Sequence, residues 1–195
     1  MGENLYICSK IAQMDFLQLV NQRQSDRGYK DKPVDKEVIL RCLEAARLAP
    51  SACNAQPWHF IVITDAELKN QLADCTSSRV LGMNHFTKQA PVHIAVVEEG
   101  ANFTSSAGSL IKKRHFPLTD IGIAVEHFCL QAASEGLGTC ILGWFDEKKV
   151  KKLLQVPGKK RIQLIITLGY SAQETREKRR KPLEQIHSFN AYGQQ

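Results

Sequence analysis

The stretch ARLAPSACNAQPWHFIVITD, residues 46–65, joins two apolar segments through a short polar loop. Before the loop, apolar residues recur at the spacing of an amphipathic helix, so we predict a helix over residues 36–48. After it, WHFIVIT is short and rich in β-branched and aromatic residues, which predicts a strand. The loop itself carries Ser51, Asn54 and Gln56 between two prolines. Because binding residues concentrate on loops held by rigid elements, we expect these side chains to bind a ligand.

Helical and strand patterns alternate along the rest of the chain. The segment 119–136 is apolar most of the way round, so we expect a helix buried in the core. Segment 161–170 is almost continuously apolar, which predicts a strand covered on both faces. Residues 100–118 show no period, and we expect a mobile loop or lid that contacts substrate. Further helices are predicted over 15–22, 66–75 and 147–154, and further strands over 92–99 and 139–145. Asp35, Asp65 and Asp146 are the predicted N-caps of the helices over 36–48, 66–75 and 147–154.

Composition indicates a soluble, globular chain. It has 195 residues, of which 43% are hydrophobic and 24% charged, enough for one domain with a real core. The sequence contains no run of about twenty apolar residues, so we expect no membrane span. We expect no export signal, and hence a cytoplasmic protein whose six cysteines are reduced and mostly buried. The six histidines lack metal-ligand spacing, so we expect no metal site.

Positive charge gathers at the C-terminal end. Residues 146–195 hold 12 lysines and arginines against 5 acidic residues, a net charge of +7, whereas the first 145 residues sum to −1. This asymmetry indicates either an anionic ligand or a solvated basic face. No aromatic residues are interleaved with the charges, so we expect no nucleic-acid partner. The lysines of the helix predicted over 147–154 are interpreted as a solvated face: Lys148, Lys149, Lys151 and Lys152.

Few side chains indicate a reaction or a ligand from their local sequence alone. RQSDR, residues 23–27, offers two guanidinium groups and a hydroxyl that could hold a phosphate, or else a solvated turn. GLGTCILG follows a helix and opens a strand, the reverse of a dinucleotide-binding turn, so Gly136 is interpreted as a helix C-cap. A Cys53–His59 nucleophile pair is conceivable, but nothing in the sequence lowers the thiol pKa, so we expect Cys53 to be packed. The lack of a recognisable catalytic motif is typical of enzymes whose cofactor carries out the chemistry.

The order of these segments resembles the FMN-dependent nitroreductase family. Arg-x-Ser-x-Arg comes first, followed by LEAARLAPSACNAQPWHF, DIGIAVEHFCLQAASEGLGTCILGWF and RRKPLEQI, from about Asp15 to about Ile186. The element Pro-Ser-x-x-Asn-x-Gln-Pro-Trp is the most specific. The resemblance implies an α+β fold with a central mixed β-sheet of about four to five strands flanked by helices, in a domain-swapped homodimer. It also implies one domain over residues 1–195, with a core over about 15–186 and a C-terminal arm, 183–195, that crosses to the partner subunit.

The same resemblance implies a set of FMN contacts. The phosphate and ribityl chain would be held by Arg23, Gln24, Ser25 and Arg27, with Lys178 and Arg180 completing the phosphate grip. The loop would reach the flavin of the partner subunit through Pro50, Ser51, Ala52 and Asn54. Leu142 and Gly143 would supply a backbone contact near the hydride-accepting nitrogen.

The activity implied is a transfer of hydride from NADH or NADPH through FMN to a small acceptor, such as a nitroaromatic or a quinone, by a ping-pong mechanism. No side chain is assigned as a catalytic acid or base. Two alternatives stay open. One is another flavin chemistry on this fold, such as dehalogenation or flavin cleavage, and the other is a non-catalytic flavin- or anion-binding module.

Overall fold

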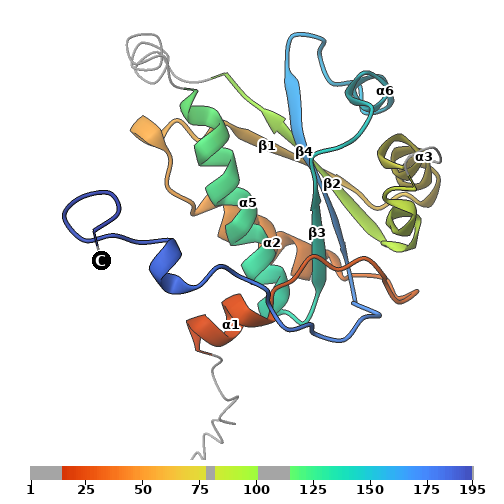
Figure 1. Ribbon diagram of the computed structural model, residues 1–195. Coiled ribbons are helices and arrows are strands. Elements are labelled where there is room, and N and C mark those ends of the chain that lie inside the picture. Colours follow the sequence, from red (N-terminus) through yellow and green to blue (C-terminus); the bar gives the residue numbers. More distant parts are fainter. Residues whose placement is uncertain (1–14, 78–81, 101–114, 195) are drawn as a thin grey trace, which may run out of the picture.

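The computed structural model describes residues 15–77, 82–100 and 115–194. In this part of the chain four strands form one sheet with helices on both faces (Figure 1). The strands are β1 (Trp58–Ile63), β2 (Val92–Glu98), β3 (Gly138–Leu142) and β4 (Arg161–Gly169), in the order β1-β2-β4-β3. The expected α+β class is therefore confirmed.

The sheet is antiparallel, and the expectation of a mixed sheet was wrong for the described strands. All three strand pairs, β1–β2, β2–β4 and β3–β4, run antiparallel. The parallel contact in this region is a single bridge between Ser25 and Thr139, outside the named strands. A parallel strand would have to be added at an edge, since both neighbours of β2 and of β4 are already antiparallel.

Five α-helices surround the sheet in the described residues. Helices α2 (Lys36–Arg47) and α5 (Phe116–Ser134) cover one face, and α3 (Ala66–Thr76) and α6 (Glu147–Leu153) cover the other, while α1 (Phe16–Gln22) lies beside α5. Short 3₁₀ turns are η1 (Ala52–Asn54), η2 (His85–Gln89) and η3 (Leu183–Gln185).

The predicted helix caps have mixed outcomes. The Asp65 carboxylate accepts from the Leu68 amide at 2.8 Å, and Asp146 accepts from the Lys149 amide at 3.1 Å. Asp35 holds the N-cap position of α2 without a side-chain hydrogen bond. Gly136, with φ +75°, follows the C-cap of α5, as its interpretation as a helix terminator requires.

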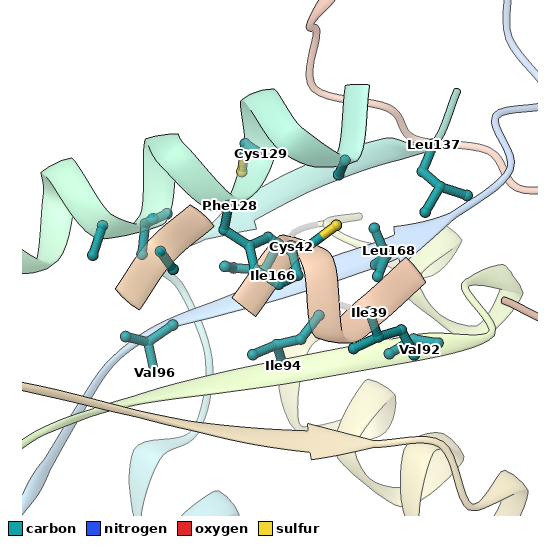
Figure 2. Packing of buried hydrophobic residues seen from close by; sticks show 14 of the residues in the cluster. Ile39, Cys42, Val92, Ile94, Val96, Phe128, Cys129, Leu137, Ile166 and Leu168 are labelled. Atoms are coloured by element: carbon teal, nitrogen blue, oxygen red, sulfur yellow. The ribbon is translucent and has the colours of Figure 1, made fainter. Parts of the chain in front are cut away.

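Alternation along β2 produces the two cores. Val92, Ile94 and Val96 point toward α2 and α5, whereas Ala95 and Val97 point toward α3 and α6. Figure 2 shows the first of these clusters, in which Phe128 of α5 lies over Ile94 and Ile166 of the sheet. Helix α5 is thus the predicted core helix, and β4, between β2 and β3, is the predicted strand covered on both faces.

Two boundaries differ from prediction. Helix α5 begins at Phe116, inside the segment expected to be a loop, because Pro117 occupies its first turn, where the fixed φ of proline suits a helix start. The rest of that expected loop, 101–114, lies outside the described residues. Strand β3 ends at Leu142, three residues earlier than expected, because Gly143 and Trp144 leave the ladder and are exposed.

The described cysteines agree in part with the expectation of buried, reduced thiols. Cys42, Cys129 and Cys140 are buried free thiols, and burial raises the pKa of Cys42 and of Cys129 to about 12. Cys75 is a half-buried free thiol, and Cys8 lies outside the described residues. Cys53 is exposed, so the expectation that it is packed was wrong: η1 places it in the polar loop and not on the core face of an element.

The described residues contain neither a membrane-spanning helix nor a cluster of potential metal ligands. Their helices are too short or too polar to cross a bilayer. Within those same residues, no three histidine, cysteine or acidic side chains come together as a metal site.

Candidate functional site

A basic groove forms where two distant segments of the chain lie side by side. Segment 23–27 follows α1, and segment 174–180 follows β4; both run past the same end of the molecule (Figure 1). The groove has a volume of about 590 Å³. Its lining includes six residues predicted to hold the phosphate and ribityl chain: Arg23, Gln24, Ser25, Arg27, Lys178 and Arg180. Arg176, Glu177 and Arg179 complete it.

Backbone contacts fix the first segment against the sheet. The Asp26 amide donates to the Thr139 carbonyl of β3 at 2.8 Å, and Ser25 forms the bridge to the same residue. Tyr29 follows as another buried anchor, because its hydroxyl lies 2.7 Å from the Thr167 hydroxyl of β4. Segment 23–27, one wall of the groove, is therefore anchored to the β3 edge of the sheet.

Positive charge in the groove is poorly balanced. Six of the lining residues are cationic, and one, Glu177, is acidic. Arg23 lies 3.1 Å from the Glu126 carboxylate of α5 by its Nε, which is buried but not aligned for a hydrogen bond. None of the other five cations belongs to an ion pair identified among the described residues. Such a concentration of charge favours an anionic ligand.

Lys178 shows the effect of this environment. Burial, and then the nearby charges of Arg23 and Arg180, lower the pKa of its ammonium group. The ammonium donates a hydrogen bond to the Arg23 carbonyl, which ties the two walls of the groove together. An anion placed among these groups would offset their mutual repulsion. Arginine forks are suited to the paired oxygens of a phosphate.

The polar loop forms a separate, strained structure. The Gln56 amide donates to the Ser51 hydroxyl at 2.9 Å, which closes the loop on itself. Cys53, Asn54 and Gln56 have φ values of 52°, 52° and 47°, the left-handed region that residues other than glycine seldom adopt. Strain of this kind gathers at ligand-binding sites and must be held by surrounding structure.

A buried carboxylate on α5 holds the loop. Both carboxylate oxygens of Asp120, which is 5% exposed, lie 3.2 Å from the Ala52 amide that donates to them. Sequence reasoning missed Asp120, although an acidic residue within an otherwise apolar core helix is a recognisable signal. The predicted site residues of the loop, which are Pro50, Ser51, Ala52 and Asn54, do not line the groove of their own chain.

The third predicted group lies at the end of β3. Leu142 is buried, and Gly143 is exposed with no atom within 4 Å of the place where a Cβ would stand. Thr139, which forms the bridge to Ser25 of the groove, lies four residues before Gly143, or about 13 Å along extended backbone. The structure therefore places the predicted residues in three groups and brings only the first together in one cavity.

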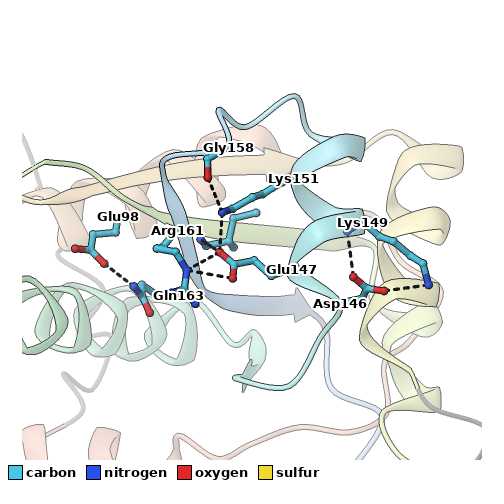
Figure 3. A network of polar contacts seen from close by, with 9 residues as sticks. Glu98, Asp146, Glu147, Lys149, Lys151, Gly158, Arg161 and Gln163 are labelled. Carbon is cyan, nitrogen blue, oxygen red and sulfur yellow. Dashed lines mark hydrogen bonds and ion pairs between the residues drawn. The ribbon is translucent and has the colours of Figure 1, made fainter.

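Charges on α6 belong to another part of the molecule. Figure 3 shows Glu147 between Arg161 and Lys151, with Asp146 paired to Lys149 nearby. Burial alone would raise the pKa of Glu147, but hydrogen bonds from Arg161, the Ile162 amide and Lys151 outweigh it and lower the pKa to about 2.

The interpretation of the α6 lysines as a solvated face needs one correction. Lys148, Lys149 and Lys152 are exposed, as expected. The side chain of Lys151 is only 16% exposed, because its ammonium group pairs with Glu147 and donates to the Gly158 carbonyl at 3.2 Å. None of the four lines the basic groove.

An antiparallel sheet between two helical layers, with a cationic groove beside its β3 edge, defines an α+β protein suited to a phosphorylated ligand. The chain belongs to the nitroreductase family, whose model, described as "Nitroreductase family", matches residues 20–170.

Proteins similar to this chain include named oxidoreductases. An "Oxygen-insensitive NADPH nitroreductase" of Helicobacter pylori is 30% identical, over 84% of this chain and 91% of its own. A solved structure named "FMN-dependent Nitroreductase" from Clostridium difficile R20291 is 30% identical with a TM-score of 0.74, covering 90% of this chain and 99% of its own. An "Iodotyrosine deiodinase" of Thermotoga neapolitana is 26% identical, over 78% of this chain and 86% of its own.

Proposed function

We propose that this chain is an NAD(P)H-dependent FMN oxidoreductase that reduces nitroaromatics, quinones or related small acceptors. The observation that carries the proposal is the groove, whose unpaired cations come from segments 23–27 and 174–180 of a nitroreductase-family chain. A phosphomonoester carries up to two negative charges at neutral pH, which matches this surplus.

The residues present fit FMN. The buried Nε of Arg23 lacks an aligned partner, and Arg27, Lys178 and Arg180 have no carboxylate partner among the described residues. These four, with the Ser25 hydroxyl, would hold the phosphate. Bound FMN would supply the hydride chemistry, accepting from NADH or NADPH and then donating to the acceptor in ping-pong order. The groove, the polar loop and the end of β3 would bind and orient the cofactor. No side chain is assigned a proton transfer.

We place the complete site in a homodimer. Ser51 and Asn54 lie outside the groove of their own chain, so in this proposal the loop serves the partner subunit's flavin. The C-terminal arm, 183–195, supports an assembled state because Phe189 is 65% exposed and Tyr192 104% exposed. In Figure 1 this tail runs away from the sheet and helices. An arm that adds to the partner's sheet would cover such residues and gain backbone hydrogen bonds. The unit proposed is one nitroreductase-like domain, residues 1–195, in the cytoplasm.

The test uses the purified protein and its visible spectrum. We expect a yellow protein whose extracted cofactor is FMN by mass spectrometry. Under anaerobic conditions NADH or NADPH should bleach the flavin absorbance, and a nitroaromatic or a quinone should restore it. A protein with no affinity for added FMN would overturn the proposal. A yellow protein that neither nucleotide bleaches would instead be a non-catalytic flavin carrier.

Reductive dehalogenation is the second candidate, favoured by the relative named as an iodotyrosine deiodinase. The two activities separate in one assay. With the same reduced protein, release of iodide from iodotyrosine is compared with reduction of a nitroaromatic at equal concentration. Faster iodide release would replace the first candidate with the second, whereas no iodide release would exclude the second.

A further inference from the structure

Gln24 lies in the basic groove, but its amide is fully used by the protein. Its Nε2 donates to Asp26 Oδ1 at 2.9 Å and to the Glu174 carbonyl at 3.1 Å. Its Oε1 accepts from the Arg176 amide at 3.1 Å and from Arg176 Nε at 3.3 Å. A primary amide has two donor hydrogens and two acceptor lone pairs, so Gln24 has nothing left to offer a ligand in this geometry.

Asp26 fixes the orientation of that amide. It is 4% exposed, and its Oδ1 also accepts from the Ser171 hydroxyl at 2.6 Å. A Cβ at Gly138 would stand 2.5 Å from Asp26 Oδ2, so the carboxylate lies directly against the backbone of β3. A buried carboxylate that accepts from Gln24 requires Nε2 to face it, and Oε1 must then face Arg176.

This arrangement holds the side chain of Arg176 through two hydrogen bonds. Its Nη2 donates to the Ser25 carbonyl at 2.7 Å, while Gln24 accepts from its Nε. Both acceptors are neutral, and none of the ion pairs identified among the described residues includes this guanidinium. The side chain is therefore held in a fixed place at the groove with its charge uncompensated.

We propose that Arg176 is a phosphate ligand of the bound FMN, and that Gln24, oriented by Asp26, is a positioning residue for Arg176. The inference rests on the proposed function, and it changes the role that the family resemblance implied for Gln24. A direct contact of Gln24 with the cofactor would require it to release at least one of its four hydrogen bonds. A held guanidinium loses less side-chain entropy when it binds than a free one does.

The test compares FMN with riboflavin, which is the same flavin without the phosphate. Dissociation constants for both are measured by flavin fluorescence on the full-length protein, in the wild type, Gln24→Leu, Arg176→Met and the double variant. Glu177→Gln, which changes a charge in the same groove but not this hydrogen-bond chain, is the matched control. The melting temperature of the flavin-free protein reports folding.

Arg176→Met should weaken FMN binding by roughly tenfold, the size of one lost charge-assisted contact, and leave riboflavin binding unchanged. Gln24→Leu should weaken FMN binding severalfold, again without an effect on riboflavin. Because Gln24 acts through Arg176, the double variant should bind FMN as Arg176→Met does. Glu177→Gln should bind FMN at least as tightly as the wild type.

Three results would overturn the inference. They are additive losses in the double variant, equal losses of FMN and riboflavin in Gln24→Leu, or an unchanged preference for FMN over riboflavin in Arg176→Met. Arg176 is exposed, so its variant decides the question even if Gln24→Leu does not fold. A wild-type protein that binds neither flavin would instead refute the proposed function.

Discussion

His93 is expected to make the protein sensitive to mild acid. It lies on β2, opposite Ile63 of β1 and Thr167 of β4, and it is completely buried. Neither ring nitrogen has a hydrogen-bond partner within the described residues. Burial, and then the charge of Lys69, lower the pKa of His93 from 6.5 to about 4.

The direction and size of the effect follow from this shift. The unfolded chain takes up a proton near pH 6.5, whereas the folded chain resists it until about pH 4. Between these values the unfolded state binds more protons, so stability falls as pH falls. The shift corresponds to about 3 kcal/mol in full, of which about 2 kcal/mol is lost between pH 7 and pH 5. Well below pH 4, where His93 is protonated in both states, this contribution no longer changes with pH.

Urea unfolding at pH 7, 6 and 5 measures the effect, at fixed protein and FMN concentrations because ligand and partner binding also shift stability. His93→Leu should remove about 2 kcal/mol of the pH dependence of the free energy of unfolding. His85→Leu, at an exposed position, is the matched control and should keep the wild-type dependence. Equal dependence in the wild type and in His93→Leu would refute the assignment of a neutral buried imidazole.

Three further outcomes are expected. Arg27→Ala should weaken FMN binding by about 1.5–3 kcal/mol, since a charge-assisted contact is lost; unchanged affinity in a flavin titration would remove this residue from the phosphate site. Converting Lys148, Lys149 and Lys152 to glutamine should leave the flavin-to-protein ratio as in the wild type, because these side chains lie outside the groove; a large loss of flavin would place the anion site on α6. Deleting residues 184–195 should lower dimer stability and flavin occupancy together; a truncated chain that sediments as a dimer with full FMN would show that the arm serves neither.

Local patterns predicted most of the fold. Asp65 and Asp146 marked two helix starts, and the apolar run of β4 predicted that both of its faces are covered. The antiparallel pairing could not be predicted in this way, because strand direction depends on contacts between distant segments. The start of α5 was predictable from Pro117, but the apparent lack of period before it favoured a loop.

The candidate site was predictable only as a set of residue types. RQSDR and the late basic run could be recognised as an anion grip, and the structure brings them into one groove. What spacing cannot show is which side chains serve the protein itself. The side-chain amide of Gln24 bonds to Glu174 and Arg176, about 150 positions away, and to the buried Asp26. Asp120 likewise holds the loop at Ala52, 68 positions before it.

The late position of β4 in the chain has a consequence for biosynthesis. Among the described strands it is made after both β2 and β3, yet it lies between them, and the second wall of the groove follows it. During translation β3 therefore has no partner among the described strands until β4 has been made. Pairing between such distant segments is also the slow part of folding. Because the groove needs both of its walls, cofactor loading must come after segment 174–180 has left the ribosome, and a chain that terminates before this segment cannot be rescued by excess flavin.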